Sequence, residues 1–291
     1  MNYLLLSIIS SSSLVLIFKF SERYTINFFQ QIVFNYITAA IIGWLIADHS
    51  ILLKPDLITQ PWVPLSIITG VLFIVIFNTV AIGVRNSGVA AVAVAQKMSL
   101  VIPVLLSVWL FNDQLSFLKT AGILLALLAI LFSAGKKDKL LLEEKNTKNW
   151  LFPVIIFIGS GLIDSSIKYS QVNYLEAIGT NLYITLLYSI AAIAGLLSLG
   201  YLLLIGKQQL ALKNIVAGIL LGIPNYISMY AMVKALDMPG YESSMVFPIN
   251  NMGIIIFSSI IAWLAFKEKI SSLKIVGIAI AIVAIAFISM S

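Results

Sequence analysis

The chain is a succession of long apolar runs separated by short polar segments. Crossing a bilayer as a helix takes about 20 apolar residues, whereas the strands of a membrane β-barrel would alternate apolar and polar positions. The runs therefore predict an all-α membrane protein with ten transmembrane helices. These are expected over Asn2–Phe20, Phe29–Ala47, Trp62–Val84, Gly88–Phe111, Leu115–Ala134, Trp150–Lys168, Glu176–Ile205, Asn214–Leu236, Gly240–Phe266 and Ser271–Met290.

Composition supports the same class. Of the 291 residues, 60% are hydrophobic and 10% are charged, whereas soluble domains contain about 25% charged residues. The chain has no cysteine, which excludes disulfides and thiolate metal sites, and we expect neither a metal nor a cofactor. The net charge of +6 comes mostly from lysines outside the spans. Such lysines attract anionic lipid headgroups and do not indicate binding of nucleic acid.

The chain divides into two similar halves around a charged linker. The linker is Lys136–Asn149, between a first half at 1–135 and a second half at 150–291. A shift of 155 positions places Asn112–Phe132 on Lys267–Phe287, and the match keeps an acid-x-x-Ser-x-Leu-Lys-x-x-Gly frame. A shift of 149 positions places Lys19-Phe20-Ser21 on Lys168-Tyr169-Ser170. Each half holds five of the predicted helices.

An odd number of helices in a repeat has a topological consequence. A five-helix unit begins and ends on opposite sides of the membrane, so the second copy must be inserted upside down. Inverted repeats of this kind are typical of secondary transporters, whose substrate site lies near the midplane between the halves. The sequence therefore predicts alternating access around a polar site shared by both halves.

The sequence resembles the ten-helix EamA-type exporters of the drug/metabolite transporter superfamily over essentially its whole length. The resemblance rests on a fourth helix with a proline or polar cluster in each half, then an acidic residue, then a glycine in the fifth helix. Those residues are Pro103, Asp113 and Gly122 in the first half and Pro248, Glu268 and Gly277 in the second. The family usually has glutamate where this chain has Asp113. The resemblance implies an exporter or exchanger of a small metabolite or amino acid in the inner (plasma) membrane, as a monomer or homodimer.

Basic residues in the loops and at their borders are unevenly divided between the two sides of the predicted membrane topology. Only Lys54, Lys119 and Lys234 fall on the side that also carries both termini. The positive-inside rule therefore predicts termini outside the cytoplasm, whereas the resemblance implies cytoplasmic termini, and both orientations stay open. The opposite, richer side carries twelve: Arg23, Arg85, Lys136, Lys137, Lys139, Lys145, Lys148, Lys207, Lys213, Lys267, Lys269 and Lys274.

Lys97 is the first candidate for the transport site. It lies near the middle of the fourth span, where a lysine costs about 2.5–3.5 kcal/mol on insertion scales. Such a residue persists where it faces a partner or a polar cavity, although a purely structural pair is the alternative. In the inverted copy, the shift of 155 places Asn251 on Gln96 and Met252 on Lys97, with Asn250 adjacent. We expect polar groups at matching depth in both halves.

Lys19 and Lys168 are the second pair of candidates. Both could simply extend to the membrane surface, but the two copies keep the same neighbours. Asp164 lies four residues before Lys168, a spacing that lets the two charges pair on one helix face. We therefore hypothesise that Lys19, Lys97 and Lys168 give one cavity a positive character that favours a carboxylate or phosphate.

The remaining candidates have competing structural interpretations. Asn78 and Asn225 could face the cavity or bridge helices. Glu242 is expected just inside the ninth helix. It could accept a proton, or it could be an N-terminal carboxylate that the helix dipole favours. Asp164 is the other acid near the cavity and the second candidate for proton coupling.

Three classes of function fit a chain of this kind. The repeats favour a secondary transporter of a small polar solute, anionic or zwitterionic, and no GxxxxGK[ST] loop for ATP is present. A channel-like or structural membrane component is the alternative. An intramembrane enzyme is less favoured, because the spans lack a nucleophile with its base and lack paired carboxylates.

Overall fold

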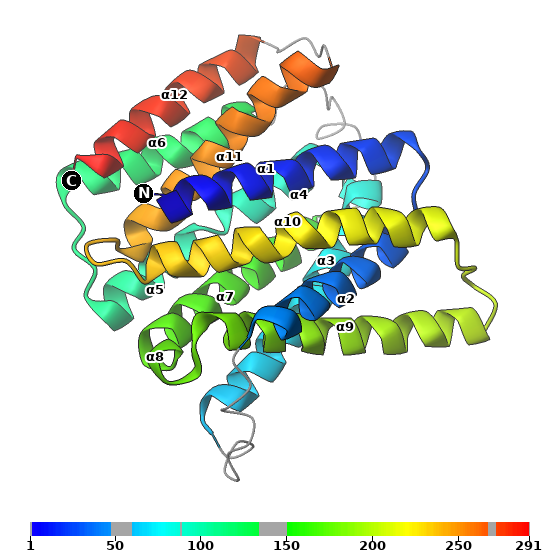
Figure 1. Ribbon diagram of the computed structural model, residues 1–291. Helices are drawn as coiled ribbons and strands as arrows, with labels where there is room; N and C mark the ends of the chain where they lie inside the picture. The colour runs from blue at the N-terminus through cyan, green and yellow to red at the C-terminus, as the bar shows by residue number, and fades with distance from the viewer. Residues whose placement is uncertain (1, 48–59, 88, 134–149, 267–271, 291) are drawn as a thin grey trace.

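The computed structural model describes residues 2–47, 60–87, 89–133, 150–266 and 272–290. Every regular element in these ranges is helical (Figure 1). The predicted linker and Glu268 lie outside the described residues. The helices are α1 Asn2–Arg23, α2 Phe28–Ile46, α3 Trp62–Ser87, α4 Val89–Met98, α5 Val101–Phe111, α6 Phe117–Ser133, α7 Leu151–Asn173, α8 Leu175–Ile178, α9 Thr180–Leu204, α10 Leu212–Leu236, α11 Ser243–Phe266 and α12 Ser272–Ser289.

The helices have the length and composition of membrane spans. Within the described residues, 8 stretches are long and apolar enough to cross a bilayer, and Phe117–Phe132 and Ile275–Ser289 are shorter apolar helices. Large apolar side chains such as Leu45, Trp109 and Leu204 are exposed on the outer surface, where a membrane protein meets lipid tails rather than water. The chain is therefore an all-α, multi-pass membrane protein.

Two of the predicted spans are broken in the structure. The predicted span Gly88–Phe111 consists of α4 and α5, which are separated at Ser99 and Leu100. Pro103 has no amide hydrogen to bond the Ser99 carbonyl four residues earlier, and the Ile102 amide bonds that carbonyl instead. The predicted span Glu176–Ile205 is interrupted at Gly179, whose φ of 80° ends the four-residue α8 before α9 begins.

Hydrogen bonds between loops define the two ends of the bundle. We call end A the end that holds Asp113, Asp237 and Ser243, where the α5–α6 and α10–α11 connections meet. End B is the end that holds Asn27 and Asn214, where the α1–α2 and α9–α10 connections meet. The Gln171 side chain of α7 donates to Asp237, so α7 ends at end A. Helix α1 ends at end B, and the two helices run in opposite directions.

The helices pack in pairs that join the first half of the chain to the second. Helix α1 packs on α10 and α11, while α7 packs on α3 and on α4 and α5. Helix α2 packs on α10, α3 packs on α9, α2 packs on α9, and α6 packs on α12. The last contact is antiparallel, since a Cβ at Gly122 near the start of α6 would lie 2.6 Å from Ile288 near the end of α12. Only glycine permits this approach.

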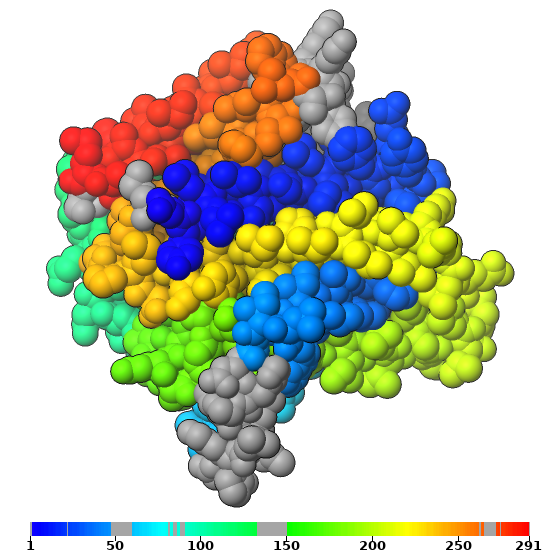
Figure 2. Space-filling view, in the orientation of Figure 1, coloured from blue at the N-terminus to red at the C-terminus, as the bar shows by residue number. Residues whose placement is uncertain are grey.

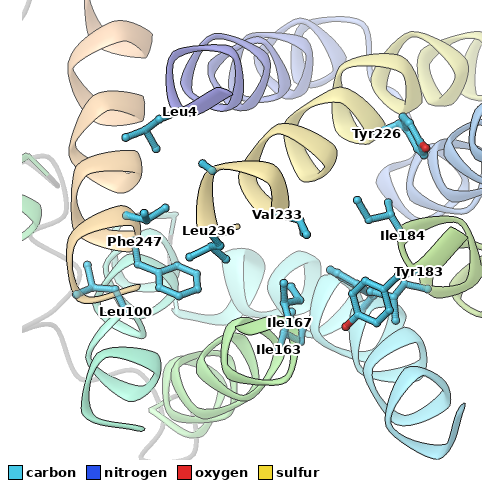
Figure 3. Close-up of a cluster of buried hydrophobic side chains, with 14 of the residues drawn as sticks. Leu4, Leu100, Ile163, Ile167, Tyr183, Ile184, Tyr226, Val233, Leu236 and Phe247 are labelled. Carbon is cyan, nitrogen blue, oxygen red and sulfur yellow. The ribbon is translucent and has the colours of Figure 1, made fainter. Parts of the chain in front are cut away.

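Apolar side chains fill the interior toward end A. Figure 3 shows Leu4, Phe247, Leu236, Val233 and Ile163, from α1, α11, α10 and α7, drawn around one region. All are buried. These side chains belong to one buried apolar cluster to which both halves of the chain contribute.

Candidate functional site

Lys97 joins the two halves of the chain inside the membrane. It lies in the last turn of α4, where the partial negative charge of a helix C-terminus favours a cation. Its Nζ donates to Asn251 Oδ1 of α11 at 2.9 Å. Both side chains are half-buried. Because α4 ends at the break before Leu100, the lysine is held at mid-bundle rather than near either end.

Asp164 supplies the opposite charge beside Lys97. It lies on α7, which packs against α4, and the two charges attract each other. The predicted pair between Asp164 and Lys168 is wrong, because Lys168 Nζ donates to Gln171 Oε1 at 2.8 Å instead. The spacing of four residues permitted the pair, but a polar partner one turn farther toward end A competes for the ammonium. Within the described residues, Asp164 makes no direct hydrogen bond.

Asn250, next to Asn251 on α11, has an unsatisfied acceptor. Its side chain is buried, and its Oδ1 accepts no hydrogen bond from the described residues. A buried amide oxygen without a donor costs about 1–3 kcal/mol, so the position suits a donor that is bound there. Gln96 is half-buried next to Lys97. Lys97, Asn251, Asp164 and Asn250 are hereafter the central site.

Asn78 and Asn225 have hydrogen-bond partners other than the residues of the central site. The Asn78 amide donates to the Ile74 carbonyl of its own helix at 2.8 Å. Asn225 donates to Asn35 Oδ1 at 3.0 Å and accepts from the Tyr188 hydroxyl at 3.2 Å, which links α10 to α2 and α9. The sequence left open whether Asn225 faces the cavity or bridges helices, and these hydrogen bonds show that it bridges helices.

Lys19 and Lys168 lie toward opposite ends of the molecule. Lys19 is one turn before the end of α1 at end B. Lys168 is buried near the end of α7 at end A, 5.7 Å from the centre of the Phe111 ring. Lys19, Lys97 and Lys168 therefore do not form one cluster, and the hypothesis that all three line one cavity is wrong. Residues that match in two oppositely directed helices are placed at opposite ends.

A network of charges at end A was missed by the sequence analysis. Lys119 Nζ and Glu242 Oε2 form an ion pair of 2.5 Å, in which the lysine side chain is 7% exposed and the glutamate 35%. Asp113 Oδ2 accepts from the Ser243 hydroxyl at 3.1 Å and from the Ser244 amide at 3.2 Å. We call Lys119, Glu242, Asp113, Ser243 and Ser244 the end-A network.

The end-A network has a local electrostatic cause. Asp113 places a negative charge on the first turn of α11, where free amides favour an anion. Lys119 lies in the first turn of α6, an unfavourable place for a cation, and Glu242 compensates it. Glu242 was expected just inside a helix but precedes Ser243, the first residue of α11. The repeated acid, serine and lysine frame was the signal that could have identified this network.

Comparisons with known proteins support the fold and leave the function open. No protein-family model matches the chain. It is 29% identical over 295 residues to an uncharacterized protein of Haemophilus influenzae, covering 98% of this chain and 96% of the relative. A solved crystal structure of another protein has a TM-score of 0.76, covering 99% of this chain and 96% of that one at 15% identity. At that identity, the likeness concerns the fold alone.

Proposed function

We propose that the protein is a secondary transporter with ten membrane-spanning helices, similar to the EamA-type members of the drug/metabolite transporter superfamily. It would carry a small anionic or zwitterionic solute through the central site by alternating access. Its place would be the inner (plasma) membrane. The proposal is supported by the helix packing, by the central site and by the end-A network.

The packing supports two inverted five-helix repeats. An exchange of α1 with α7, α2 with α9, α3 with α10, α4 and α5 with α11, and α6 with α12 converts most of the observed helix contacts into one another. Thus α1 on α10 becomes α7 on α3, and α2 on α10 becomes α9 on α3. The contacts of α2 with α9 and of α6 with α12 map onto themselves. Such a pattern is expected when a two-fold axis in the membrane plane relates the halves.

The central site supports a solute that carries negative charge. Lys97 comes from the fourth membrane span of the first half and Asn251 from the corresponding span of the second. Their hydrogen bond crosses the interface at which the halves would separate. An incoming carboxylate or phosphate can replace Asn251 as the partner of Lys97 with a stronger, charge-assisted bond. Asp164 can hold the ammonium group of a zwitterion or a transported proton.

The end-A network supports a conformation that is closed at end A. Its contacts link the α5–α6 connection of the first half to the start of α11 in the second half. The buried Phe247 of Figure 3 follows Ser243 by one turn of α11. In an alternating cycle these contacts break when end A opens. The charge distribution of the sequence favours end B as the cytoplasmic side.

The single observation that carries the proposal is the hydrogen bond between Lys97 and Asn251 inside the membrane. The test is counterflow in proteoliposomes, with radiolabelled L-amino acids, dicarboxylates and phosphorylated metabolites as probes. We expect transient accumulation of at least one labelled probe against its gradient, which a channel cannot produce. Lys97→Ala should abolish it, Lys97→Arg should retain part of it, and the surface variant Lys207→Ala should match the unaltered protein. Accumulation by Lys97→Ala at the normal rate would contradict the proposal.

A further inference from the structure

A groove on the outer surface between α1 and α10 is distinct from the central site. Its volume is 660 Å³, within the range of about 300–1,000 Å³ that is usual for small-molecule sites. It lies near end B, where α1 ends and α10 begins. The lining residues are Ile17, Phe20, Ser21, Tyr24, Ile26, Leu212, Lys213, Val216, Ala217 and Leu220.

The walls of the groove suit a hydrocarbon chain. They consist mainly of aliphatic and aromatic side chains, and Phe20, Leu212, Val216 and Leu220 are exposed there. The Ser21 hydroxyl does not contribute a free polar group, because it is already bonded to the Ile17 carbonyl and the Gln31 amide. Figure 2 shows α1 and α10 side by side on the outer face of the molecule. A groove open to the side in this way is filled from the membrane.

Lys213 gives the groove a charged mouth. Its Nζ donates to the Tyr24 carbonyl at 3.4 Å and to the Thr25 hydroxyl at 3.2 Å. Both acceptors are neutral, so neither compensates the charge of the exposed ammonium. Arg23 is exposed in the last turn of α1 at the same end. Tyr24 lies at the end of the helix, the depth at which tyrosine meets lipid headgroups.

We propose that this groove binds one anionic phospholipid, with an acyl chain between α1 and α10 and the phosphate on Lys213. The apolar walls would hold the acyl chain, and Lys213, whose hydrogen-bond partners among the described residues are both neutral, accounts for the preference in charge. The bound lipid contacts one helix from each half. The site does not depend on the transport activity proposed above.

The test is native mass spectrometry of the full-length protein with dioleoylphosphatidylglycerol and dioleoylphosphatidylcholine as probes. The unaltered protein should bind the anionic lipid about fivefold more tightly, the equivalent of about 1 kcal/mol for one lysine at a membrane surface. Lys213→Gln should lose this preference while it still binds both lipids. Lys207→Gln, which changes an exposed lysine outside the groove, should keep it.

A second pair of variants tests the apolar wall. Val216→Trp fills the groove and should weaken the binding of both lipids, whereas Ile219→Trp alters an exposed residue of α10 outside the groove and should not. Full lipid binding by Val216→Trp would overturn the proposal, as would an intact preference in Lys213→Gln. Binding of soluble glycerol phosphate that depends on Lys213 would also overturn it, because the site would then need no acyl chain.

Discussion

Replacing Glu242 with glutamine removes the charge that faces Lys119 at end A. The glutamine oxygen can still accept hydrogen bonds from Lys119 and from Ser244. The variant therefore removes the negative charge while it keeps the hydrogen-bond acceptor. A hydrogen bond to a charged group contributes about 1.5–3 kcal/mol. Loss of a fully buried pair costs about 3–5 kcal/mol, but the glutamate is 35% exposed and water screens it. We therefore expect a loss of about 1.5–3 kcal/mol. This loss shifts the equilibrium between the closed and open states of end A by about 10- to 100-fold.

Thiol labelling measures this shift, because the natural chain has no cysteine. Val246→Cys places a thiol of similar size at a buried position in the first turns of α11. In sealed vesicles, a membrane-impermeant maleimide supplied on the end-A side should label this thiol faster when Glu242→Gln is present. Glu176→Gln is the matched control, because it removes an exposed carboxylate outside the end-A network and should leave the rate unchanged.

Two further measurements separate opening of end A from general unfolding. A thiol introduced as Ala191→Cys, buried on α9, should stay unlabelled in the Glu242→Gln background. The charge reversal Lys119→Glu with Glu242→Lys should restore slow labelling at Val246→Cys. Unchanged labelling in Glu242→Gln, or equal acceleration at Ala191→Cys, would refute the view that the pair holds end A closed.

Two other predictions concern packing and capping. Asp113→Ala should lower the free energy of unfolding by about 1 kcal/mol, as for a lost helix cap, and speed amide hydrogen exchange at Ser244; unchanged exchange would contradict the cap. Gly122→Ala should destabilise the protein by about 1–3 kcal/mol in a thermal unfolding assay, because the new Cβ would lie 2.6 Å from Ile288 and 3.1 Å from the Ala284 carbonyl. Gly200→Ala, with no atom within 4 Å of its Cβ, is the control and should not destabilise.

The helices could be predicted from the sequence because lipid imposes a simple requirement on each span. Backbone groups must be paired within a helix of membrane length, so apolar runs such as Asn2–Phe20 and Asn214–Leu236 correspond closely to α1 and α10. Breaks inside spans were harder to predict, since proline acts differently in different places. Pro103 coincides with the division of α4 from α5, whereas Pro224 and Pro248 lie inside continuous helices.

The central site was only partly predictable, because sequence spacing reports neighbours along one helix and not across helices. The depth of Lys97 identified it, and the internal repeat brought in Asn251. The same reasoning paired Asp164 with Lys168, although the structure turns Lys168 toward Gln171 and end A. The pair of Lys119 and Glu242 joins residues 123 positions apart, and only the tertiary arrangement brings them together.

The proposal that the two halves run in opposite directions is tested most directly by labelling the ends of α1 and α7. Tyr24 and Asn173 are exposed residues at the ends of these two helices. Single thiols introduced as Tyr24→Cys and Asn173→Cys are treated in sealed vesicles with an impermeant maleimide from each side. We predict that each thiol is labelled from one side only and that the two sides differ. Labelling of both thiols from the same side would contradict the inverted repeats and the transport mechanism that depends on them.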